Sequence, residues 1–255
     1  MRSVRTGGML TVLATTAILC GCEMLDRVTV DDGHAPLVAG SIVARPDSMK
    51  YGSSGRIRGG IEVGYERQLA EGTQRLDANH YVSFDSDAKP FVVGGSNRLS
   101  GPQVIRNRVS IEHGHIAYNA LFSLGGFFEF EPSLGIGYDE MLVSSSGLAA
   151  SVGQPPPGST PVEFTKRKQA WGATAGVVPR WNFSKFAAIE ARARYGVGDN
   201  VASSLYGGAV VLRPIPNIEL SGGYLWRQQE IELPDYVSNI RFKVHGPLVA
   251  VRFVF

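Results

Sequence analysis

The last residues of the chain, KVHGPLVAVRFVF (Lys243–Phe255), alternate with a period of two. Successive side chains of a β-strand point to opposite sides of a sheet, so this pattern predicts a strand with one apolar face. That face carries Phe255, Phe253, Val251 and Val249, and Arg252 lies on the other face. Chain ends are usually polar and frayed. We therefore expect this strand to be held by apolar surroundings.

The same period recurs through the body of the chain. The sequence has 255 residues, 44% of them hydrophobic, and 31 are glycine, which suits many strands and tight turns. No helical period is seen after residue 55, and no later apolar run reaches the ~20 residues of a membrane helix. Eight alternating segments are found instead, at approximately 57–69, 104–122, 127–143, 163–181, 186–197, 202–213, 218–232 and 240–255.

Each segment has one apolar face, and the opposite faces together carry charges of both signs mixed with Gly, Ser and Thr. In 186–197, Ile189 and Ala191 share a face, and Arg192 and Arg194 lie opposite. Short connections (123–126, 182–185, 214–217) alternate with long ones (70–103, 144–162, 233–239), and the brief 198–201 is the exception. Aromatic residues gather towards strand ends, namely Trp171, Trp181, Tyr195, Tyr224 and Trp226. These features favour an enclosed polar interior over a half-buried soluble sheet.

The terminal strand resembles the C-terminal signature of bacterial outer-membrane barrels, and residues 56–255 resemble the small OmpA/OmpX-type barrels in pattern. The resemblance implies an all-β fold, an eight-stranded antiparallel transmembrane β-barrel. It also implies that Phe255, Phe253 and Val251 form a signal for the barrel-assembly machinery. Ten strands would fit equally if 37–44 and 80–93 were added, although both alternate poorly.

Two finer expectations follow from the eight strands. Upstream of Gly246-Pro247 the charged residues Arg241, Lys243 and His245 share the face that is apolar further on, which predicts a β-bulge at this dipeptide. An even number of strands would also place the N-terminus and Phe255 on the same, periplasmic side, together with the short turns.

The N-terminal stretch MRSVRTGGMLTVLATTAILCGC has the layout of a secretory signal. Its Leu19-Cys20-Gly21-Cys22 resembles the bacterial lipobox. The resemblance implies that 1–21 is a lipoprotein signal peptide and that Cys22 is acylated, for example with palmitate. Ordinary cleavage by the general signal peptidase is the alternative. Glu23 is not the Asp that favours inner-membrane retention in that family, so we expect the Gram-negative outer membrane. Residues 22–55 are expected to form a tether with one short strand at 37–44.

Composition excludes several classes of function. The net charge is +2, and the expected signal peptide holds Arg2 and Arg5, so a basic excess for nucleic acid is absent. Both cysteines lie in the first 22 residues, which leaves none for a disulfide or a cysteine metal site. No glycine-rich phosphate loop leads from a strand into a helix, and we expect no cofactor. His113 and His115 share a face and could bind a metal with a third ligand, but we expect polar interior residues and no metal site.

Catalytic residues cannot be named from the sequence. Ser110 or Ser238 with His245 could supply a nucleophile and a base, but no family motif surrounds them. We expect a non-enzymatic outer-membrane lipoprotein with a structural or surface-interaction role in its outer loops, including SSSGLAASVGQPPPGSTP at 144–161. A lipid-modifying barrel enzyme and a lipid-anchored lipocalin-like barrel are the alternatives. The expected partners are outer-membrane lipids and the barrel-assembly and lipoprotein-processing machinery. The interior charges are expected to pair and fill the barrel.

Overall fold

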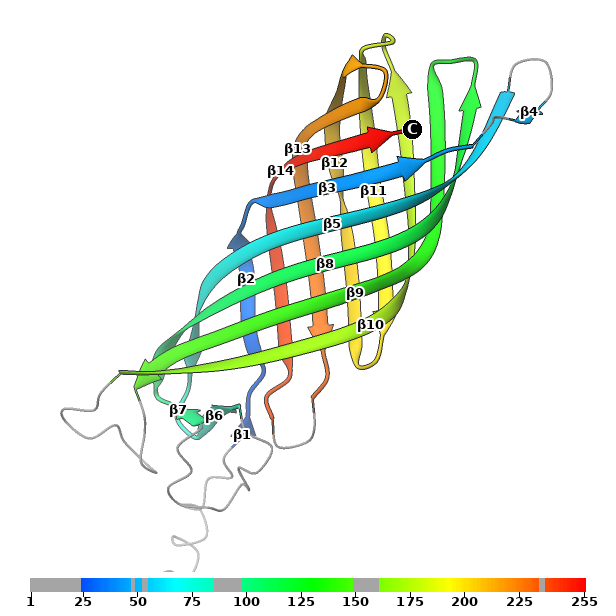
Figure 1. The fold of residues 1–255 in the computed structure, drawn as a ribbon. Coiled ribbons are helices and arrows are strands. Elements are labelled where there is room, and N and C mark those ends of the chain that lie inside the picture. The colour runs from blue at the N-terminus through cyan, green and yellow to red at the C-terminus, as the bar shows by residue number, and fades with distance from the viewer. Residues whose placement is uncertain (1–23, 47–48, 52–54, 85–97, 149–160, 234–236) are drawn as a thin grey trace, which may run out of the picture.

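A computed structural model describes residues 24–46, 49–51, 55–84, 98–148, 161–233 and 237–255 (Figure 1). These residues form an all-β fold without a helix. The strands are β1 (Met24–Leu25), β2 (Val28–His34), β3 (Leu37–Ala44), β4 (Met49–Tyr51), β5 (Gly55–Leu76), β6 (His80–Ser83), β7 (Arg98–Ser100), β8 (Gln103–Leu124), β9 (Phe128–Leu148), β10 (Pro161–Asn182), β11 (Ala187–Gly198), β12 (Val201–Ile215), β13 (Ile218–Ile231) and β14 (Ile240–Val254).

Nine of the described strands pair into a closed ring, in the order β13-β12-β11-β10-β9-β8-β5-β3-β14 and back to β13. Eight of them, β5 and β8 to β14, are the eight segments expected from the sequence. The ninth is β3, which pairs antiparallel with β5 and parallel with β14. β2 precedes β3 along the same edge of β14, also in parallel. The expected closure of eight antiparallel strands, with β14 paired directly to β5, is therefore wrong, because β3 lies between these two strands.

The ninth strand comes from the segment expected to be a tether. The expected short strand 37–44 is confirmed, but it is built into the ring rather than hanging from it. Of the second segment needed for ten strands, only β6 is a described strand. β6 pairs with β1 and β7 in a separate three-stranded sheet, so ten ring strands are not formed by the described residues.

The odd number of ring strands separates the two ends of the described chain. β1 lies at the end of the ring that also carries β6 and β7, and the C-terminus lies towards the opposite end (Figure 1). The short turns between β8 and β9, β10 and β11, and β12 and β13 lie at the end of Phe255. The expectation that both chain ends share one side fails, because β3 runs parallel to β14.

β14 keeps its phase along its whole length. Its register against β13 runs without a shift from Ile218↔Phe253 to Ile231↔Ile240. The buried Phe242 and Val244 therefore share the inner face with Arg252. The expected β-bulge at Gly246-Pro247 is therefore wrong. The same positions face inward along the whole strand, but the inner face changes from apolar to polar.

The same exchange of polarity occurs on β8. Towards the short turns, Ile116 and Tyr118 are exposed on the outer face and His113 lies inside. Towards the long loops, Arg106 and Arg108 are outside, and the inner residues are apolar (Ile105, Val109, Ile111) except for the hydrogen-bonded Asn107. We call the part of the ring with an apolar exterior the belt and the part with a polar exterior the head, and the head includes β1, β2, β6 and β7.

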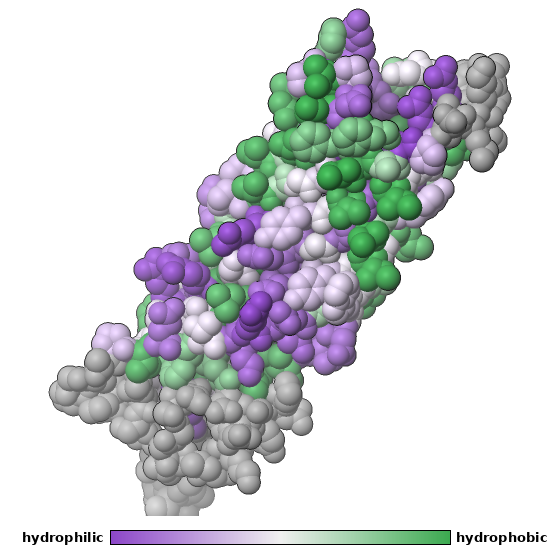
Figure 2. Space-filling model, in the orientation of Figure 1, coloured by the Kyte–Doolittle hydropathy of each residue, from purple (hydrophilic) through white to green (hydrophobic). Residues whose placement is uncertain are grey.

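Most of the ring follows this division, although Val104, Leu142 and Leu69 are apolar residues exposed on the head. Exposed apolar residues of the belt include Val38, Ile42, Ile61, Val63, Ile116, Tyr118, Leu134, Ile136, Ile189, Val210, Leu212, Leu220 and Val249. Exposed polar residues of the head include Arg67, Arg75, Arg106, Arg108, Thr165, Arg167, Gln169, Gln228 and Lys243. Figure 2 shows hydrophobic side chains gathered over the upper part of the visible face and hydrophilic ones below them. The head interior holds the main apolar core, with Val28, Val30, Leu76, Leu99, Ile105, Val109, Ile111, Met141, Val143, Ile231 and Phe242.

Candidate functional site

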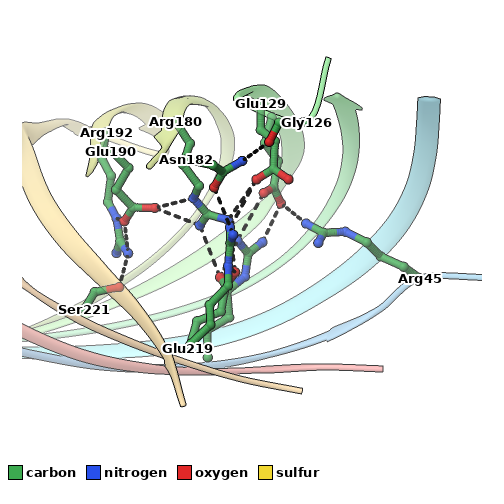
Figure 3. Close-up of polar contacts among 12 residues, drawn as sticks. Arg45, Gly126, Glu129, Arg180, Asn182, Glu190, Arg192, Glu219 and Ser221 are labelled. Atoms are coloured by element: carbon green, nitrogen blue, oxygen red, sulfur yellow. Dashed lines mark hydrogen bonds and ion pairs between the residues drawn. The ribbon is translucent and has the colours of Figure 1, made fainter. Parts of the chain in front are cut away.

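The interior of the belt is lined by arginines and glutamates from different strands. Arg180 of β10 is 3% exposed and stands at the centre of one cluster (Figure 3). Its guanidinium donates to Glu190 of β11 (Nη2–Oε2, 2.8 Å) and to Glu219 of β13 (Nη1–Oε1, 3.0 Å). Arg213 also donates to Glu219 (Nε–Oε1, 2.9 Å) and to Glu129 (Nη2–Oε2, 3.2 Å). The cluster thus joins β9, β10, β11, β12 and β13.

A second cluster forms around the inward-pointing Arg252 of β14. Its guanidinium contacts Glu131 of β9 and donates to Glu62 of β5 (Nη2–Oε2, 3.1 Å). Arg45, which follows β3, donates to the same Glu131 oxygen that Arg252 Nη2 contacts (Nη2–Oε1, 2.6 Å). The inward orientation expected for Arg252 is confirmed. Arg45 is not among the interior residues expected from the sequence, because its segment was expected to form a tether outside the ring.

A third cluster consists of Glu66 with Arg194 and Arg227. Arg194 of β11 donates to both carboxylate oxygens of Glu66, and Arg227 of β13 donates to Oε2 at 2.5 Å. Buried charges are tolerated when they are paired, and each arginine of the three clusters forms an ion pair with a glutamate. A cavity of about 110 Å³ remains between the clusters, lined among others by Glu62, His115 and Thr174.

His113 and His115 lie side by side on the inner face of β8. Their rings are 5.5 Å apart, and His113 Nδ1 is 2.9 Å from Asp139 Oδ1. In the described part of the chain, no group of three or more His, Cys, Asp or Glu side chains is arranged to hold a metal ion. The pair thus extends the polar interior.

The residues nominated for catalysis do not come together. His245 faces outward on β14, where its Nδ1 is bonded to the Tyr224 hydroxyl. The buried Ser238 Oγ accepts the Ser83 N–H in the head (2.9 Å). Ser110 lies on β8, which β5 and β3 separate from β14 in the ring. These contacts give neither serine a general base at His245.

The proposed assembly residues lie on the outside of the last strand. Phe253 and Phe255 are 38% and 65% exposed. The backbone of Phe255 is nevertheless fixed: its N–H donates to Val43 O (2.9 Å), and its carbonyl accepts the Arg45 N–H (2.7 Å). The chain end is thus hydrogen-bonded to the end of β3. Cys22, the expected acylation site, lies outside the described residues.

The exterior of the head carries paired charges. Arg106 and Arg108 both donate to Glu71 (Nη2–Oε2, 2.5 Å; Nε–Oε1, 2.7 Å). These two hydrogen bonds hold the pKa of the Glu71 carboxyl below its ordinary value. Such pairs are typical of a surface in contact with water.

Comparison of the chain with protein-family models, curated proteins and solved structures finds no match. Among the described residues no helix is long and apolar enough to cross a membrane.

Proposed function

We propose that the ring is a transmembrane β-barrel of the outer membrane, with the belt inside the bilayer and the head projecting from it. The observation that carries this proposal is the exchange of polarity along single strands such as β8. A soluble protein has an apolar interior throughout, as the head does. An apolar exterior around a charged interior is the arrangement of a barrel in lipid.

The dimensions of the belt support the proposal. Trp171 and Trp181 are exposed on the outer face of β10, ten residues apart in the sequence. At ~3.3 Å per residue and a tilt of ~40°, ten residues span about 25 Å, the height of the apolar band of outer-membrane barrels. Tyr138 and Phe128, next to them on β9, have the same spacing. Aromatic girdles of this kind mark the two membrane interfaces.

The interior favours a structural or surface-interaction role over transport. Charges of both signs are paired across the belt, so no continuous path is lined by one sign of charge. We propose that the barrel holds the head and its long connections outside the bilayer, where they meet other molecules. The lipid-modifying alternative is weakened, because the nominated Ser110, Ser238 and His245 do not come together. The lipocalin-like alternative needs the charged face outside, whereas in the belt it is inside.

Membrane fractionation with heat-shift electrophoresis tests the proposal. We expect the protein in the outer-membrane fraction, with a faster-migrating band before boiling, because a closed barrel resists detergent. Recovery in the soluble periplasmic fraction without a heat shift would contradict it. In planar bilayers the purified barrel should give no stable stepwise conductance.

The lipid anchor is a separate part of the proposal and rests on Leu19-Cys20-Gly21-Cys22. Cys22→Ser should abolish incorporation of labelled palmitate, and Cys20→Ser, the matched control, should keep it. Undiminished labelling of the Cys22→Ser variant would refute acylation at this residue.

A further inference from the structure

We propose that the N-terminus of the mature chain lies on the head side of the membrane, opposite Phe255. An acyl group on Cys22 would then anchor the protein from the side of the long connections. The inference rests on the proposed function, since it takes the belt as the part that crosses the bilayer.

The parallel contact of β3 with β14 carries the inference. Seven pairs, from Leu248↔Leu37 to Val254↔Val43, fix the direction of β3. The chain therefore enters the belt from the end at which β14 begins and leaves it at the other end. With nine crossings, the point where the chain enters the first strand and the point where it leaves the last strand lie on opposite sides. With eight crossings they would lie on the same side. Bacterial single-chain barrels usually have even numbers of strands, so this topology departs from the common one.

The first described residues are tied to the head. The Met24 N–H donates to Asn79 O (2.8 Å), and the Asp26 N–H donates to Tyr81 O (2.7 Å). The Asp26 carboxylate also lies 3.0 Å from His80 Nδ1. The first described residue, Met24, therefore lies on the head side, away from the short turns. Cys22 is two positions before Met24, a reach of at most about 7 Å.

β2 is held in the head by side-chain hydrogen bonds on the edge that faces β5, where it forms no backbone ladder. No backbone pairing joins β2 to β5. Instead, the Gln74 side chain accepts the Thr29 N–H (3.0 Å) and donates to Arg27 O (2.7 Å). Asn107 Nδ2 donates to Thr29 O (2.8 Å). These bonds replace ladder bonds and keep the entering chain against the wall of the head.

β2 and β5 also lie close enough for a covalent test. A Cβ built at Gly72 would lie 3.7 Å from Val30 Cβ. This separation is typical of a disulfide. The double variant Val30→Cys/Gly72→Cys should therefore form a cross-link in the folded protein and none when it is unfolded before oxidation.

Labelling of single cysteines on whole cells tests the side of the N-terminus. Arg27→Cys reports on the N-terminal segment, Arg167→Cys on the head and Lys185→Cys on a short turn; all three positions are exposed. Met24→Cys is a second N-terminal probe that leaves the Arg27–Glu230 pair intact. The parent chain, whose cysteines are Cys20 and Cys22, gives the background. Each variant is treated with a membrane-impermeant maleimide before and after permeabilisation of the outer membrane.

We expect the N-terminal probes to react under the same condition as Arg167→Cys, and Lys185→Cys under the opposite condition. If the N-terminal probes are labelled under the same condition as Lys185→Cys, and Arg167→Cys under the opposite condition, the inference is wrong. The membrane-spanning belt would still hold in that case. Equal labelling of all probes under both conditions would overturn the spanning belt itself, and the inference with it. Failure of the Val30→Cys/Gly72→Cys cross-link in folded protein would contradict the placement of β2.

Discussion

Glu66 of β5 and Arg194 of β11 form two parallel hydrogen bonds across the interior of the belt, Oε1–Nη1 at 2.7 Å and Oε2–Nη2 at 2.5 Å. Glu66 and Arg194 are 128 positions apart in the chain. The same carboxylate accepts a hydrogen bond from Arg227 of β13. One glutamate thus hydrogen-bonds two arginines from strands that meet only when the ring is closed.

Glu66→Gln should destabilise the protein strongly, because Arg194 and Arg227 would lose the carboxylate to which both are hydrogen-bonded. Breaking a buried pair typically costs about 3–5 kcal/mol. Glu230→Gln, which breaks the exposed pair with Arg27, should cost at most ~1 kcal/mol. Urea unfolding in lipid vesicles, followed by tryptophan fluorescence, measures both. Equal losses in the two variants would show that the interior pairs are no better shielded than surface pairs.

An arginine should be tolerated on the outer face of the head and not on that of the belt. Ala191→Arg places a charge on the belt and should lower the free energy of unfolding by roughly 2–4 kcal/mol, as for barrels in lipid. Thr165→Arg, on the exposed face of β10 in the head, should change it by ~0.5 kcal/mol or less. The same vesicle assay compares them, and similar costs at both positions would argue against two different surroundings.

Deletion of Phe255 should impair assembly more than final stability. Loss of one terminal aromatic forfeits at most ~1.5–3 kcal/mol of apolar burial, and the closed ring keeps the remaining backbone hydrogen bonds. We expect less protein in the outer membrane and a nearly normal heat-shift temperature in the molecules that insert. Phe183→Ala, which removes another exposed aromatic side chain at a short turn, should assemble normally. Wild-type abundance of the deletion variant would remove the assembly role.

Acid should selectively weaken the surface contact of Glu71. Its pKa is lowered in the folded protein by the hydrogen bonds from Arg106 and Arg108, so this contact stabilises the fold above the ordinary carboxyl pKa. The contribution is lost as the pH falls through the lowered pKa of the folded state. The difference in urea midpoint between wild type and Glu71→Gln should therefore shrink on acidification. A difference that grows at low pH would have the wrong sign.

The strands of the ring were predictable wherever their two faces differ. The eight predicted segments all form strands, because apolar and charged residues alternate in each. β3 was discounted because both of its faces are small or apolar: Val38 and Ile42 point out, and Leu37 and Val43 point in. On β14 the apolar residues change from even to odd positions along the sequence. A β-bulge and a change in the environment of the two faces produce the same sequence pattern, and the bulge expected from the sequence does not occur.

The candidate site was predictable in kind but not in its contacts. Alternation placed Arg192, Arg194 and Arg252 inside, and the structure confirms it. Their partners depend on which strands face each other across the ring, and the sequence does not encode this locally. Arg252 and Glu131, for example, are 121 positions apart. The head was not foreseen, because its apolar inner face has the same period as the apolar outer face of the belt.

A cysteine scan along the outer face of β8 tests the membrane-spanning belt most directly. Ile116→Cys and Phe122→Cys lie in the belt, and Arg106→Cys and Arg108→Cys lie in the head on the same face of the same strand. In membranes, the belt positions should react with a lipid-soluble maleimide and resist a water-soluble one, and the head positions should react readily with the water-soluble reagent. Uniform reactivity with the water-soluble reagent along β8 would contradict a belt that lies in lipid.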